Sequence, residues 1–213
     1  MKFKLLFLAL FFNINYIFSQ SLIELDKYEM SYLKKDFIIE VKNDNTIKKK
    51  KKDINKYLID YYISVQSKED INNNDRISLL IKHYKYDKFI EYLENIKSKY
   101  VEWKNIAIAN NIEEINKTIE IKAPIIDAVF HYSDWHMDGL VHLETKFTKF
   151  DDNFSILINS DELTSWSNEF IKNKGFLMIF RSEEEIEDFI NKLNNEKAIE
   201  LIKSKEAKED LFK

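Results

Sequence analysis

Apolar and polar positions alternate along the segment from Trp135 to Phe147. Its odd positions are mostly apolar, and its even positions carry His136, Asp138, His142, Glu144 and Lys146. Successive side chains of an extended chain point to opposite faces, so this pattern predicts a long, half-buried β-strand that continues toward Phe150. Histidines and carboxylates gather on this strand, which makes it the first place to look for chemistry.

Shorter apolar runs predict further strands, at 37–42, 57–65, 77–81, 125–132, 154–159 and 176–180. Stretches rich in Asn and Asp separate several of them, at 43–45, 72–75 and 151–153, and these residue types favour turns. The segment 161–174 has an irregular pattern that predicts no regular element. Together the runs predict an antiparallel β-sheet of roughly seven or eight strands.

A helical period appears twice. Apolar residues from Phe89 to Ala107 recur every three or four positions, which predicts an amphipathic helix over 87–109 with Asp87 as its cap. Ser182 and Glu185 have the spacing of a capping box and predict a second amphipathic helix over 183–193. A charged helix is expected over 196–208. Helices packed on an antiparallel sheet make an α+β fold.

The two halves of the chain repeat one arrangement, in which an apolar strand precedes an amphipathic helix. The strands are 77–81 and 176–180, and both helices that follow contain the dipeptide Phe-Ile. We therefore expect one domain over 20–213, with two interpretations open. It is either a single undivided unit or a pair of repeat halves, 22–111 and 112–213.

Residues 1–19 have the pattern of a secretory signal peptide, in which Lys2 and Lys4 precede an apolar run at 5–12. The run is shorter than the about 20 apolar residues that span a bilayer. The chain has no cysteine, so it has neither a disulfide nor a cysteine-linked lipid anchor. We expect a periplasmic or secreted protein that is not a lipoprotein and has no integral membrane segment after cleavage.

Composition excludes several classes of function. The formal net charge is −4 and becomes −6 without the leader, which contains two lysines and no acid. This mixed, acidic balance argues against a nucleic-acid partner, and the lysine run at 48–52 is expected to be a solvated turn rather than a patch for an acidic partner. Gly139 and Gly175 are the only glycines, too few for a phosphate-binding loop, and we expect no cofactor.

A metal ion is the sharpest chemical hypothesis. His136 and Asp138 lie two residues apart on the expected strand, with side chains about 6.6 Å apart, and could share an ion. His142 lies roughly 20 Å from His136 along an extended strand and would reach that ion only through a bend. The sequence thus allows a metal-assisted hydrolase that uses His136, Asp138 and His142. The simpler interpretation of the same residues is a solvated polar face of a sheet.

No other catalytic constellation is visible. The sequence has no Gly-x-Ser-x-Gly turn, and nothing in it brings a histidine to Ser160, Ser165 or Ser167. The preferred interpretation is an exported, non-catalytic binding or interaction domain for a protein, peptide or glycan. Trp166, in the irregular segment 161–174, is the tryptophan expected to be exposed and to contact the ligand.

A family resemblance agrees with the expectation of export. Lys99-Tyr100-Val101-Glu102-Trp103, the Asn110-Asn111 pair, Trp135-His136 and the strand at 175–180 before an acidic helix occur in an order that resembles small exported proteins of Bacteroidetes-type bacteria. The leader, which ends Phe18-Ser19-Gln20, is similar to theirs. That family has no assigned activity and no named functional residues, so no site is carried over to this chain.

Overall fold

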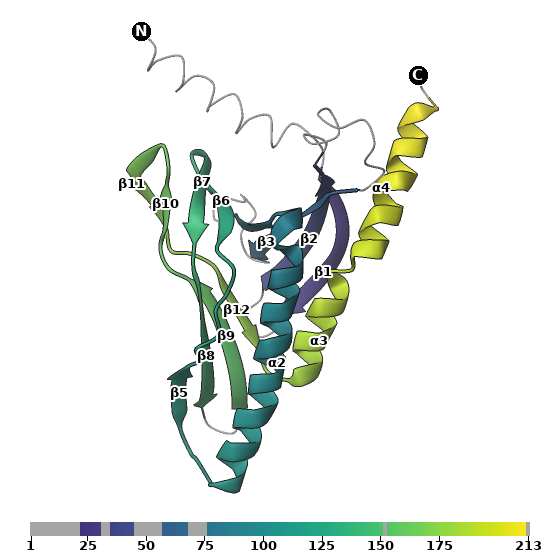
Figure 1. Cartoon of the computed structure of the whole chain (residues 1–213). Coiled ribbons are helices and arrows are strands. Elements are labelled where there is room, and N and C mark those ends of the chain that lie inside the picture. The colour runs from purple at the N-terminus through teal and green to yellow at the C-terminus, as the bar shows by residue number, and fades with distance from the viewer. Residues whose placement is uncertain (1–21, 31–34, 45–56, 68–75, 151–152, 212–213) are drawn as a thin grey trace.

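The structure is a computed structural model that describes residues 22–30, 35–44, 57–67, 76–150 and 153–211. Antiparallel strands form three sheets, and helices pack on them, so the predicted α+β fold is confirmed (Figure 1). The signal peptide 1–19, the lysine run 48–52 and the turn residues 72–75 and 151–152 lie outside the described residues. None of the helices in the described part of the chain could cross a membrane, given their length and polarity.

The largest sheet contains six strands in the order β1-β2-β3-β4-β6-β7, and all neighbouring pairs are antiparallel. The strands are β1 (Ile23–Met30), β2 (Lys35–Asn43), β3 (Ile59–Ser67), β4 (Ile77–Ile81), β6 (Ile126–Tyr132) and β7 (Asp134–Val141). Phe37, Ile39 and Val41 of β2 are completely buried on the core face. The alternating positions Glu40 and Lys42 lie on the opposite face, as the strand period requires.

A second sheet of four strands has the order β12-β9-β8-β5, and β10 and β11 form a separate two-stranded sheet. The strands are β5 (Ile115–Thr118), β8 (Leu143–Phe150), β9 (Asn153–Ser160), β10 (Leu163–Ser165), β11 (Asn168–Asn173) and β12 (Leu177–Phe180). The antiparallel pairing matches the prediction, although the strands divide among three sheets rather than one. The prediction that 161–174 contains no regular element was wrong, because this segment forms the β10–β11 hairpin.

Helices α2 (Tyr86–Ala109) and α3 (Glu183–Lys192) pack on each other and on the strands, and both confirm the predicted amphipathic helices. A short 3₁₀ turn, η2 (His83–Lys85), leads into α2. No side chain caps α2, so the predicted Asp87 cap was wrong. The hydroxyl of Ser182 does cap α3, by accepting a hydrogen bond from the Glu185 N–H at 3.2 Å. The charged helix α4 (Asn195–Asp210) closes the described chain beside β1.

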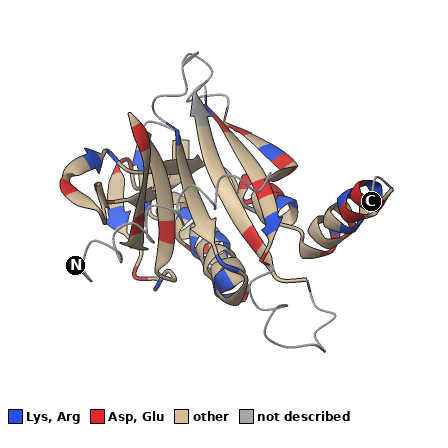
Figure 2. Cartoon of the chain, turned by 90° about the horizontal axis from the view of Figure 1, so that it is seen from above, with Lys and Arg blue, Asp and Glu red and all other residues tan. Residues whose placement is uncertain are grey.

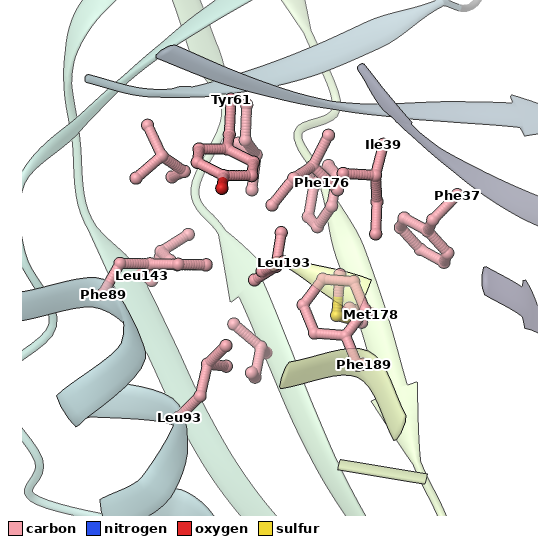
Figure 3. Packing of buried hydrophobic residues seen from close by; sticks show 14 of the residues in the cluster. Phe37, Ile39, Tyr61, Phe89, Leu93, Leu143, Phe176, Met178, Phe189 and Leu193 are labelled. Atoms are coloured by element: carbon pink, nitrogen blue, oxygen red, sulfur yellow. The ribbon is translucent and has the colours of Figure 1, made fainter. Parts of the chain in front are cut away.

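One apolar core joins the two larger sheets and the helices. Figure 3 shows Phe89 and Leu93 of α2 beside Leu143 of β8, with Phe176, Met178 and Phe189 close by. Most of these side chains are less than about one-twentieth exposed. Strands β6 and β7, which follow residue 112, complete the sheet formed by β1 to β4. The two expected halves therefore share a sheet, and their origin by duplication stays a prediction.

The long strand expected over 135–147 is in fact two strands. β7 ends at Val141, opposite Ile126 of the six-stranded sheet, and β8 begins at Leu143, opposite Ser160 of the four-stranded sheet. The exposed His142 lies between them. A register shift in the β6–β7 pairing marks a bulge just before this break, and bulges bend a strand and increase its twist. The prediction of one continuous strand was therefore wrong.

Candidate functional site

The bulge in β7 decides which way the predicted metal ligands face. Residues directly opposite each other in an antiparallel pair lie on one face of the sheet. His136 is opposite the buried Phe130, and Asp138 is opposite the buried Ala128, so both lie on the core side of the sheet. His142 follows the core-facing Val141 and is exposed. The expectation that the two histidines and Asp138 share a face was wrong.

His136 connects two hairpins. Its Nε2 atom lies 3.2 Å from the carbonyl oxygen of Tyr132, and its Nδ1 atom lies 3.1 Å from the hydroxyl of Ser165. A carbonyl can only accept, so the Nε2 N–H of His136 donates to Tyr132, and Nδ1 forms the second hydrogen bond with the Ser165 hydroxyl. Ser165 Oγ in turn accepts from the Ser167 N–H at 3.3 Å. The imidazole therefore ties the β6–β7 turn to the β10–β11 hairpin.

Sequence reasoning missed this histidine–serine pair, because 29 positions separate the two residues. The pair resembles the base and nucleophile of a hydrolase in its spacing, since both lie within hydrogen-bond reach. Ser165, however, is only 3% exposed. A hydroxyl covered to that extent has no open approach for a substrate, so the pair is a structural contact.

Asp138 has a similar structural role. Its Oδ2 atom accepts a hydrogen bond from the Thr164 N–H at 2.9 Å, and its Oδ1 atom accepts from the Leu140 N–H at 3.2 Å. The first bond attaches β10 to β7, and the second holds the backbone beside the bulge. Both carboxylate oxygens of Asp138 therefore accept hydrogen bonds from backbone N–H groups, and loss of the carboxylate would remove the acceptors of these two groups.

Trp166 lies at the turn of the β10–β11 hairpin and is fixed to β7. The backbone N–H of Trp166 donates to the backbone carbonyl of Met137 at 3.0 Å. Its indole occupies the space next to Gly139, so closely that a Cβ built on Gly139 would lie 1.8 Å from Trp166 Cζ2. Even so, Trp166 is 63% exposed. The predicted exposure of Trp166 is confirmed. The indole can approach β7 this closely only because residue 139 is a glycine and has no side chain.

Three other exposed apolar side chains lie on the same two hairpins as Trp166 or at their ends. Figure 1 shows the β10–β11 hairpin beside the β6–β7 hairpin at one end of the molecule. Tyr132 is 57% exposed at the end of β6, Leu140 is 66% exposed next to Gly139, and Phe170 is 86% exposed on β11. We call Tyr132, Leu140, Trp166 and Phe170 the hairpin patch. The hairpin patch is the candidate functional site, and all four of its side chains are more than half exposed.

A second cluster brings acids and a histidine together at the ends of β2, β3 and β4. Among the residues that the structure describes, only Asp44, Asp60 and His83 form a group of three possible metal ligands, with ligand atoms within 4.8 Å of one another. Asp60 is 3% exposed. Sequence reasoning missed this group, because strand pairing brings together residues that are 16 to 39 positions apart.

This cluster already contains its own cation. The Lys82 ammonium lies 3.0 Å from Asp60 Oδ2, and the backbone N–H of His83 donates to Asp60 Oδ1 at 2.9 Å. Burial, with repulsion from Lys82, lowers the pKa of the neighbouring Lys42. A metal ion would have to displace the Lys82 ammonium from Asp60. The arrangement is therefore a satisfied ion-pair network rather than an open metal site.

Ser64, Ser78, Glu40 and Arg76 continue this polar network across the same face of the sheet. The two serine hydroxyls lie 2.6 Å apart, and the carboxylate of Glu40 accepts from Ser64 at 3.2 Å and from Arg76 at 3.1 Å. Each group has a partner within the network.

Comparison with protein families, with curated proteins and with solved structures finds no significant match for this chain.

Proposed function

We propose that this protein is an exported, non-catalytic binding domain that recognises a protein, peptide or glycan through the hairpin patch. One observation carries the proposal: Trp166 is 63% exposed and yet held against β7 by a backbone hydrogen bond and by the Gly139 contact. Large aromatic side chains dominate the energetics of binding sites, and Trp is the residue most enriched among those that contribute most.

Fixing an exposed aromatic in advance improves binding. A side chain that is already held loses little conformational entropy when a ligand covers it, so more of the contact energy appears as affinity. Trp166 meets this condition through Met137 and Gly139, and the surrounding hairpin is held by His136 and Asp138. His136 and Asp138, which suggested chemistry in the sequence, and the rare Gly139 thus support one exposed ring.

The alternative, a metal-assisted hydrolase, has less support. His136 and Asp138 use their polar atoms to hold the hairpins, and His142 faces the other way. A ligand set needs donor atoms that converge on one point. The proposal therefore favours binding over metal catalysis at this strand.

The patch can be tested with a glycan array and a peptide array of defined composition. We expect the mature protein to bind a subset of probes, and the Trp166→Ser variant to lose at least about tenfold in signal on that subset, as for a central aromatic contact. Leu211→Ser is the matched control, because it removes another exposed apolar side chain, 80% exposed, from the end of α4. Equal binding by wild type and Trp166→Ser would refute the patch as the site.

Export is tested separately. Expression of the full chain in a Gram-negative host, followed by N-terminal sequencing of the exported protein, should give a chain that begins at Gln20. A protein retained in the cytoplasm with an intact Met1 would refute this part of the proposal.

A further inference from the structure

We draw no further inference here: the strongest candidate, the side-chain cluster of Asp44, Asp60 and His83 at the ends of β2, β3 and β4, already holds the Lys82 ammonium in a molecule whose acidic and basic residues are interspersed (Figure 2), and nothing in the part of the chain that the structure describes points to a ligand for it.

Discussion

Replacing Gly139 with alanine tests whether Trp166 occupies the position described. The added Cβ would lie 1.8 Å from Trp166 Cζ2 and 2.4 Å from Cη2, much closer than two carbon atoms can approach. Gly175 is the only glycine with positive φ in the described residues, so the backbone at position 139 accepts alanine. The three atoms nearest to the added Cβ all belong to the indole, so either the indole or β7 must move.

The size of the effect follows from the surface that the ring loses. Trp166 is 63% exposed, so just over a third of its surface is covered. For a side chain of about 250 Å² this is roughly 90 Å², or about 2 kcal/mol at 25 cal/mol per Å². Loss of the backbone bond to Met137 would add about 1 kcal/mol. We expect Gly139→Ala to lower the free energy of unfolding by about 1 to 3 kcal/mol.

A double-mutant cycle with Trp166→Ala isolates this contact. Urea unfolding is followed by far-UV circular dichroism, because fluorescence would change with the removal of a tryptophan. Without the indole, Gly139→Ala should be neutral or even stabilise by up to about 1 kcal/mol, since glycine inside a strand is less favourable than alanine. An equal loss of stability in both backgrounds would show that the indole does not lie against Gly139.

Three further changes probe the supports of the fold. Asp138→Asn should lower the free energy of unfolding by about 1 to 2 kcal/mol in urea, because one backbone N–H then faces an amide NH₂, while the exposed control Asp134→Asn stays within about 0.5 kcal/mol. Ser182→Ala should cost about 1 kcal/mol through loss of the α3 cap, measured in the same way. Burial alone would raise the pKa of Asp26, but the hydrogen bond from Lys197 and further positive charge hold this pKa below its ordinary value. Asp26→Asn should therefore destabilise at neutral pH by no more than about 1 kcal/mol, and the difference from wild type should vanish as the pH falls through the lowered pKa; a difference that persists in acid would refute the ion pair.

Elements with local signals were predictable from the sequence. Strand β4 has the predicted bounds of 77–81, because turn residues at 72–75 precede a short, mostly apolar run. Helix α3 begins where the Ser182 and Glu185 capping pair places it, and this signal lies within four residues. Helix α2 buries the predicted stripe, since its period of apolar positions is long enough to be distinctive. In each case the determining contacts are close in sequence.

The division into sheets and the β10–β11 hairpin depend on distant contacts. Strand β10 has only three residues, and its attachment comes from His136 and Asp138 of β7. Sequence pattern in 161–174 could not show this support, because the acceptors lie more than twenty positions away. The signal that could have suggested it was the pair of polar residues on an apolar strand. Polar side chains that face a core need partners, and here a covering hairpin supplies them.

A single extra residue explains why the three candidate metal ligands do not share one face of the sheet. Alternation over Trp135 to Phe147 assigns His136, Asp138 and His142 to one face only if the period of two is unbroken. The bulge between the pairs Ile126–Val141 and Ala128–Asp138 shifts the pairing by one residue, so that His136 and Asp138 face the core side and His142 does not. Polar groups turned inward in this way must be satisfied, and the β10–β11 hairpin satisfies them with Ser165 and Thr164. The same hairpin carries Trp166 to the surface beside Gly139, so the residues that first suggested catalysis instead account for how this exposed ring is held in place.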